Sequence, residues 1–465
     1  MKKITNKVLW IFAVGQFGWS LLSGIISSWM VYYYTGEGAV FGSAITVKPL
    51  FLSVTLFGLI TAVGRLFDAV TDPLIAGWSD ASSFKGGRRI PFMKVIAIPF
   101  AVITVGVFAF PATGSVIAND VILFITLMLF YLFMTIYCTP YNALIAELGD
   151  TQKNRINVST YISFTYIAGL SVAYLLPNLA GLFTASLGAA NAVRLAIAIL
   201  AAVAAIAMLV PSFFIRERDY IHSEPVKTKA FSSLFKSFKN KQFRRFVYSD
   251  VIYFFAVTLF QTGLAFYITR LMHASESNTF LLTVVMTVVS LCLYPVVNRL
   301  APKLGKKKII IVGFFAYAAV FLVASLCREG LWWGYLIAVL AGIPMAILGI
   351  LPQAVVADIA EADALTYGEQ RSGMFFAART FAMKLGQALS LLIFTSVTVS
   401  GTEFSYRMTA IIATVCCLVG AVLFFLYNES SIMQTIVSAG KPESEAPDGV
   451  SDAETSGADD TEAAP

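Results

Sequence analysis

Long apolar runs alternate with short polar segments about twelve times along this chain of 465 residues. A bilayer core about 30 Å thick is crossed by roughly 20 apolar residues in an α-helix, and each run approaches or exceeds that length. The pattern therefore predicts an all-α integral membrane protein with twelve transmembrane helices, at residues 9–34, 46–79, 91–112, 119–146, 157–182, 191–215, 246–272, 278–299, 308–327, 332–358, 373–400 and 408–428.

Composition agrees with this pattern and excludes most soluble folds. Hydrophobic residues make up 58% of the chain. Charged residues make up only 13%, about half the share of an ordinary soluble domain. The five cysteines lie in apolar runs without metal-ligand spacing, and His222 and His273 are too few for a histidine metal site. Because the spans contain no Ser–His, His–Glu or Cys–His constellation, we expect a protein that is not an enzyme and needs no cofactor.

Basic residues mark one side of the membrane. Lysines and arginines are enriched in cytoplasmic segments of membrane proteins. One set of segments includes two basic clusters, at 216–245 and 299–308. The opposite set holds only Lys48, Arg194, Arg270, Arg328 and Arg407. This asymmetry predicts that both termini are cytoplasmic and that the number of helices is even.

The two halves of the chain resemble each other. SDASSFKGGRRIP follows the second apolar run, and NRLAPKLGKKKII follows the eighth. AELGDTQKNR follows the fourth run, and ADIAEADALTYGEQR follows the tenth. Duplicated six-helix halves with a binding site between them at mid-membrane are typical of the major facilitator fold.

We therefore expect four parts in the chain. Residues 1–215 form a six-helix bundle with the cation site, and residues 246–430 form a second bundle. Residues 216–245 form a basic cytoplasmic linker, either a plain tether or a helix on the inner leaflet. Residues 431–465 are rich in Ala, Glu, Asp, Ser, Pro and Gly, and this composition predicts disorder.

Charged residues inside the second apolar run predict a cation site. Arg65, Asp68 and Asp72 share one helix face because they stand at i, i+3 and i+7. An ionised group at the bilayer centre costs roughly 2.5–3.5 kcal/mol on insertion scales. Two neighbouring carboxylates repel each other, and a bound Na⁺ or a shared proton relieves that repulsion. Thr71 adds an oxygen beside them. The alternative is a structural Arg–Asp cluster that tightens helix packing.

The eleventh run supplies charges of the opposite sign. Lys384 lies about 15 Å deep at 1.5 Å per residue, and Arg379 lies closer to the cytoplasm. Lys384 is either a counter-ion that couples Asp68 and Asp72 to the second half or a substrate ligand. Arg379 is either a substrate ligand or an interfacial residue whose charged head reaches the lipid headgroups.

These motifs carry a resemblance to a known family. RLFDAVTDP, GWSD, GGRRIPF, TPYNALIAEL, ADIAEADA and RTFAMKLGQAL resemble the glycoside–pentoside–hexuronide:cation symporters, the melibiose permease-like members of the major facilitator superfamily. The likeness covers roughly the first 430 residues. It implies a multi-pass transporter of the bacterial cytoplasmic membrane that acts as a monomer among membrane lipids and binds no nucleic acid. The cargo it implies is a small sugar or glycoside with co-transported Na⁺, Li⁺ or H⁺.

The resemblance also implies residue roles. Asp68, Thr71, Asp72 and Thr135 correspond to the cation site. Among the implied substrate residues, Lys384 matches the family's eleventh-helix lysine, Thr380 matches a sugar-proximal threonine, and Tyr141 follows Pro140 as the family's aromatic residue does. Ser20, Cys138 and Ser163 stand where the family's type member has two acids and an arginine for its galactoside, and Arg379 stands where it has a neutral glutamine. Fewer acids and one more base predict a more positive cavity, hence an acidic glycoside or hexuronide as substrate.

The cytoplasmic loops supply candidates for an inner gate. Ion pairs between the two halves are expected there, although the same charges are also typical of membrane anchors with local salt bridges. A lipid or lysolipid transporter on the same fold is the alternative function, since eukaryotic lysolipid carriers are distantly similar. The gate candidates are Arg88, Glu147, Arg155, Asp358, Glu361 and Arg371.

Overall fold

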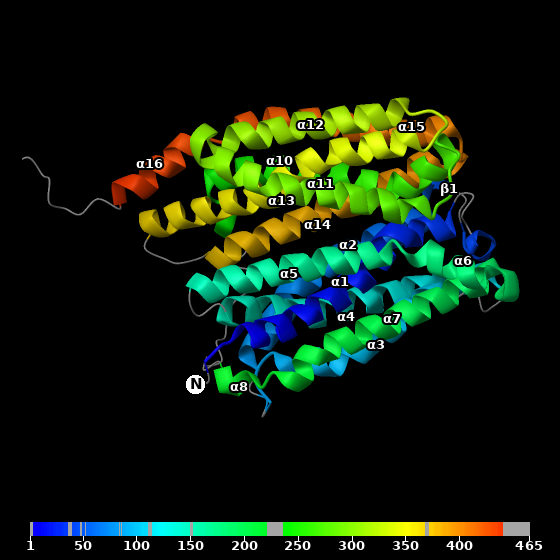
Figure 1. The fold of residues 1–465 in the computed structure, drawn as a ribbon, viewed down its shortest axis with the longest axis horizontal. Coiled ribbons are helices and arrows are strands. Elements are labelled where there is room, and N and C mark those ends of the chain that lie inside the picture. The colour runs from blue at the N-terminus through cyan, green and yellow to red at the C-terminus, as the bar shows by residue number, and fades with distance from the viewer. Residues whose placement is uncertain are drawn as a thin grey trace, which may run out of the picture.

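The computed structural model is almost entirely helical (Figure 1). It describes residues 3–35, 40–46, 49–51, 53–82, 84, 86–109, 114–148, 152–220, 236–367 and 372–439. The first half of the chain contains α1 (Asn6–Tyr34), η1 (Gly42–Ala44), β1 (Pro49–Phe51), β2 (Val54–Thr55), α2 (Leu56–Ala81), α3 (Ile90–Ala109), α4 (Val116–Leu148), α5 (Gln152–Ala173), α6 (Leu176–Leu187), α7 (Ala189–Phe214) and α8 (Glu217–Tyr220).

The second half repeats a similar series of helices. A π-helical turn, η2, extends the first of them, and a 3₁₀ turn, η3, follows the fifth. The elements are α10 (Lys241–Phe266), η2 (Tyr267–Leu271), α11 (Asn278–Leu304), α12 (Lys306–Leu326), α13 (Trp332–Tyr367), α14 (Ser372–Val397), η3 (Thr398–Ser400), α15 (Glu403–Phe425) and α16 (Glu429–Ala439).

Most predicted helices are present, with two informative differences. The second begins at Leu56 rather than near residue 46, because the antiparallel strands β1 and β2 precede it. The Thr55 hydroxyl caps it by accepting from the Gly58 amide at 3.0 Å. The predicted fifth helix is two helices, α5 and α6, and Pro177 stands in the first turn of α6, where its fixed φ suits a helix start.

Eleven segments of the described chain are long and apolar enough to cross a membrane. The predicted second span is not among them. Its helix, α2, is 26 residues long but carries Arg65, Asp68, Asp72 and Asp80 within its apolar sequence. The prediction of twelve spans with cytoplasmic termini stays a prediction.

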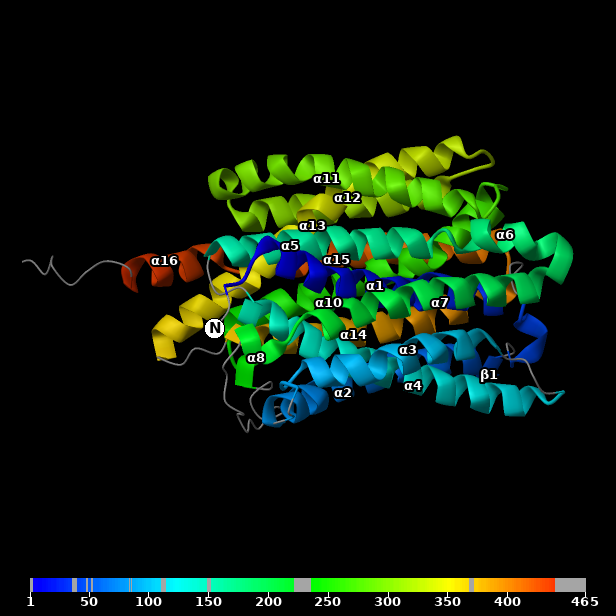
Figure 2. The same cartoon turned by 60° about the horizontal axis from the view of Figure 1, so that its bottom comes forward.

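The helices run nearly parallel and pack in two sets. In Figure 1, α1 to α7 lie below and α10 to α15 lie above. Helix α2 of the first set packs along α14 of the second, and α1 packs against α10. Figures 1 and 2 agree that the N-terminus, α8 and α16 lie at one end of the bundle, which we call the basic end. Strand β1 and helix α6 lie at the other, which we call the α6 end.

The end of the chain departs from the expected disorder. Helix α16 covers residues 431–439 of the segment predicted to be disordered, so that prediction is wrong there. The reason is an apolar stripe on an otherwise polar sequence, which includes Ile432 and Ile436 and packs on the bundle beside α13. Residues 440–465 and the middle of the predicted linker, 221–235, lie outside the described residues.

Candidate functional site

The acidic face of α2 points into the bundle. Leu66, Val70 and Leu74 recur every four residues and are all exposed, so they form the outer stripe of this helix. Asp68 and Asp72 stand two residues from Val70 on either side, about 160° away around the helix at 100° per residue. Asp68 is accordingly 0% exposed, and the side chain of Asp72 is 27% exposed.

Two hydroxyl-bearing side chains gather around Asp68. The Thr135 hydroxyl, from α4, donates to Asp68 Oδ1 at 2.9 Å. Thr71 Oγ1 lies 3.3 Å from Thr135 Oγ1 and donates to the Asp68 carbonyl at 3.1 Å. Carboxylate and hydroxyl oxygens are ligands that suit a hard cation. The structure thus brings together Asp68, Thr71 and Thr135, as the sequence predicts.

Lys384 reaches this group from the other half. Its ammonium, on α14, lies 2.9 Å from Asp68 Oδ1 and 2.6 Å from Asp72 Oδ2. A single positive charge between two carboxylates removes their mutual repulsion, as a bound monovalent cation would. Lys384 is therefore a counter-ion to both carboxylates and ties α2 to α14.

Arg65 completes the cluster. Its guanidinium lies 3.5 Å from Asp68 Oδ2 and 5.1 Å from the ring centre of Tyr131, a cation–π contact that the sequence did not reveal. Within the described residues, Asp68 Oδ2 and Arg65 Nε are buried and have no hydrogen-bond partner. The charges of Arg65, Lys384, Asp68 and Asp72 cancel.

Arg379 is neither an interfacial residue nor a free cation. It is 9% exposed and forms a bidentate ion pair with Asp250 of α10, with Nε–Oδ2 at 2.8 Å and Nη2–Oδ1 at 3.0 Å. The rings of Phe246 and Phe254 lie 5.7 Å from its guanidinium carbon. Asp250 cancels the charge on which the prediction of a positive cavity depended. The sequence signal for this ion pair is Asp250 itself, an acid inside an apolar run, close to the basic segment that precedes the run.

Two predicted substrate residues are fully buried in contacts between helices. Ser20 is fully buried and bonds to the Phe17 carbonyl at 3.1 Å, and its hydroxyl lies where a Cβ on Gly169 would stand. Tyr141 is also fully buried, stacks on Phe12 at 4.2 Å and donates to the Phe12 carbonyl at 2.9 Å. Both side chains hold α1 against its neighbours.

The other three predicted substrate residues retain some exposure. Cys138 and Thr380 are half-buried, and Ser163 is exposed on α5. Tyr166, three residues further along α5, is 39% exposed, and its ring centre lies 5.9 Å from that of Trp19 on α1. Trp19 Nε1 is buried without a hydrogen-bond partner in the described chain. Sequence reasoning missed both aromatic residues, because aromatic side chains are common in any membrane helix.

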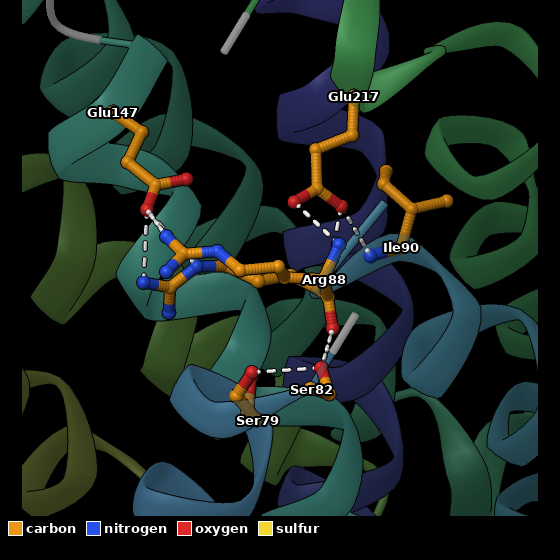
Figure 3. A network of polar contacts seen from close by, with 7 residues as sticks. Ser79, Ser82, Arg88, Ile90, Glu147 and Glu217 are labelled. Carbon is orange, nitrogen blue, oxygen red and sulfur yellow. Dashed lines mark hydrogen bonds and ion pairs between the residues drawn. The ribbon is translucent and has the colours of Figure 1, made fainter. Parts of the chain in front are cut away.

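Charged residues at the basic end pair within one half. Glu147 of α4 accepts from Arg88 and Arg89, with Nη2–Oε1 distances of 2.9 Å for both (Figure 3). The Glu217 carboxylate accepts from the backbone amides of Arg88, Arg89 and Ile90, where α3 begins (Figure 3). Carboxylates at a helix N-terminus accept hydrogen bonds from its free amides and interact favourably with the positive end of the helix dipole.

The second half repeats this arrangement. Lys306 pairs with Asp358 of α13. The Glu429 carboxylate accepts from the amides of Lys306 and Lys307 at 2.8 and 3.0 Å, where α12 begins. Gly87 and Gly305 have positive φ and leave room for the two carboxylates. The predicted repeats therefore place equivalent clusters in both halves.

The gate candidates do not form the expected pairs between halves in the part of the chain that the structure describes. Arg88 and Glu147 pair within the first half, and Asp358 pairs within the second. Glu361 is exposed, whereas the Arg155 side chain and Arg371 lie outside the described residues. Besides the contacts of Lys384 with α2, the halves touch near the α6 end. Tyr32 meets Phe266 at 5.0 Å, and Thr395 presses against Gly58.

A family model for MFS/sugar transport proteins matches residues 11–428. The chain belongs to this family. Its fold is accordingly that of the major facilitator transporters, and the chain is a multi-pass membrane protein. Chain-long similarity also links it to a solved structure of a proton-dependent oligopeptide transporter. That structure superposes with a TM-score of 0.67 at 12% identity, over 93% of this chain and all of the other.

Three curated relatives of this MFS/sugar transport protein are named as transporters or symporters. The uncharacterized symporter YnaJ of Bacillus subtilis is 24% identical, over 84% of this chain and 82% of its own. The isoprimeverose transporter of Lactiplantibacillus pentosus is 23% identical, over 82% and 78%. The sodium-dependent lysophosphatidylcholine symporter 1 of Xenopus tropicalis is 22% identical, over 82% and 80%. These relatives and the solved neighbour are transporters, so the chain is a transporter and not an enzyme. They also support co-transport of a cation and a small molecule.

Proposed function

We propose that this protein is a glycoside symporter coupled to a monovalent cation, Na⁺ or H⁺, and that it works by alternating access. One observation carries the proposal: the Lys384 ammonium lies between Asp68 and Asp72 and joins the two halves. A cation that enters among Asp68, Asp72, Thr71 and Thr135 displaces Lys384 from the carboxylates. Displacement breaks the link between α2 and α14 and frees the halves to move.

The membrane potential drives this step. A cation that crosses the membrane gains about 2.3 kcal/mol per charge per 100 mV. The displaced Lys384 keeps its charge, so it needs a new partner in the cation-bound state. The hydroxyls of a bound solute supply hydrogen-bond acceptors for it. Cation and solute therefore stabilise the same state, which is the condition for coupled transport.

The charge balance favours a neutral solute over an acidic one. Arg379, the residue that suggested an acidic glycoside, is neutralised by Asp250. The mid-membrane cluster of two acids and two bases also carries no net charge. The name of the isoprimeverose transporter among the relatives supports a neutral glycoside. Tyr166 and Trp19 offer aromatic faces against which the apolar side of a sugar ring can pack.

Uptake into proteoliposomes tests this function. We expect a neutral glycoside from a panel of neutral and acidic sugars to accumulate when an inward Na⁺ or H⁺ gradient is imposed. Asp68→Asn should abolish gradient-driven accumulation, whereas Glu329→Gln, which removes an acid whose side chain is 83% exposed, should leave it unchanged. Accumulation by Asp68→Asn at the wild-type level would contradict the assigned cation site.

One relative supports a second candidate, transport of a lysolipid. That relative is named a sodium-dependent lysophosphatidylcholine symporter. The same proteoliposomes decide between the two functions when lysophosphatidylcholine is added to the panel. Na⁺-driven uptake of the lysolipid without uptake of any sugar would replace the glycoside proposal and keep the cation site.

A further inference from the structure

A groove opens on the membrane-facing side of the second half, between α11, α12 and α13. Its volume is about 270 Å³. Its walls include Val296 and Leu300 from α11, Val312 from α12 and Ile343 from α13, all of them exposed. This groove is separate from the cation cluster, because none of the residues that line it belongs to α2, α4 or α14.

The groove has the length of one membrane leaflet. On α11 it extends from Leu293 to Leu304, which is about 16 Å at 1.5 Å per residue. Half of a bilayer core about 30 Å thick is nearly the same. Leu304 is the last residue of α11, and Lys306 begins α12 at the basic end of the bundle. The groove therefore starts at that membrane surface and ends near the bilayer centre.

A lysine stands at the mouth of the groove with its charge available. Of three consecutive lysines, Lys306 pairs with Asp358 and Lys307 donates to the Phe425 carbonyl. Lys308 lines the groove, and its ammonium has no hydrogen-bond or ion-pair partner in the described chain. Lys303 stands seven residues, or two helical turns, after Val296, so it is on the same stripe of α11 as the groove.

We propose that this groove binds one acidic phospholipid from the leaflet at the basic end. An acyl chain lies along the apolar walls, and the phosphate contacts Lys308 and Lys303. The lysines lie at the membrane surface, where a phospholipid has its headgroup. The apolar walls extend toward the bilayer centre, where the lipid has its acyl chains. Basic pockets between transmembrane helices on the cytoplasmic side bind acidic headgroups in this way.

Lipid retention by the purified full-length protein tests the proposal. Wild-type protein is exchanged from equimolar phosphatidylglycerol and phosphatidylcholine into detergent, and the bound lipid is counted by native mass spectrometry. We expect about one retained phosphatidylglycerol and little phosphatidylcholine. Lys308→Gln should weaken phosphatidylglycerol binding about fivefold, since a basic residue near an acidic surface contributes about that factor. Val296→Trp should abolish retention by filling the groove.

Matched variants control for general effects. Leu322→Trp places the same ring on an exposed position of α12 that does not line the groove, and Lys7→Gln removes a lysine at the basic end of α1. Both should retain phosphatidylglycerol as the wild type does. Equal retention of the two lipids, or unchanged retention in Lys308→Gln and Val296→Trp, would overturn the proposal. The readout involves no transport, so it is independent of the proposed function.

Discussion

Helix α14 carries two buried cations that differ in what they join. Lys384 reaches across to Asp68 and Asp72 of α2, in the other half of the chain. Arg379 pairs with Asp250 of α10, in its own half. A motion of one half against the other must break the first contact and leaves the second intact. Equal burial thus hides different places in the fold: the first ion pair joins the two halves, and the second lies within one half.

The largest effect is expected from breaking the pair within the half. Arg379→Ala leaves Asp250 buried and uncompensated, which destabilises a protein by about 3–5 kcal/mol. We expect a lower midpoint of thermal unfolding in detergent. The double variant Arg379→Met with Asp250→Leu removes both charges and should recover most of that loss. A single variant as stable as the wild type would show that Asp250 does not depend on Arg379.

Breaking the pair between the halves should have a different, cation-dependent effect. Lys384→Met leaves Asp68 and Asp72 facing each other without a counter-ion, so Na⁺ no longer competes with an ammonium. Ligand at 100 times its dissociation constant stabilises a protein by about 2.7 kcal/mol. We expect NaCl, compared with choline chloride, to raise the unfolding midpoint more in this variant than in the wild type. The double variant of Arg379 and Asp250 serves as control and should respond as the wild type does. An equal response in Lys384→Met would separate Lys384 from the cation site.

The smallest effect is expected at the α6 end, outside the spans. Glu276 lies between η2 and α11. Partial burial raises the pKa of its carboxyl above the usual 4.5, and a hydrogen bond with Tyr32 of the first half opposes that rise. The folded protein therefore holds the proton on this carboxyl more tightly than the unfolded chain does. Stability from this group is present at low pH and falls as the pH rises above 4.5. Unfolding midpoints between about pH 4 and 7 should show this slope, and Glu276→Gln should flatten it. A slope that persists in this variant would assign the dependence to another group.

The sequence predicted the cluster of Lys384 with Asp68 and Asp72 but not the pair of Arg379 with Asp250, and the reason is physical. Asp68, Asp72 and Lys384 are conspicuous because charges deep in an apolar run are costly. Asp250 stands near the start of its run, next to a basic segment, where an acid needs no special explanation. The partner of a charge depends on how distant helices pack, which the order of residues along the chain does not reveal. For the same reason the sequence did not reveal that Arg88 pairs with Glu147, and Asp358 with Lys306, within one half.

The fold could be predicted from the sequence more completely than the site. Twelve apolar runs and two internal repeats are enough for the major facilitator architecture, because lipid requires each span to satisfy its own backbone. Helix ends depend on local contacts, and these explain the later start of α2 at Leu56, which Thr55 caps, and the break before Pro177. Aromatic residues such as Trp19 and Tyr166 gave no signal, since packing and binding use the same side chains.

The carboxylates of Glu217 and Glu429 have a consequence for how the molecule is assembled. Each comes just after the last membrane helix of its half and caps an earlier helix of that same half. In each half, a carboxylate that follows the last membrane helix therefore holds the start of an earlier helix in place. Both partners of each cap lie in the same half, so a chain severed between the halves would keep both contacts.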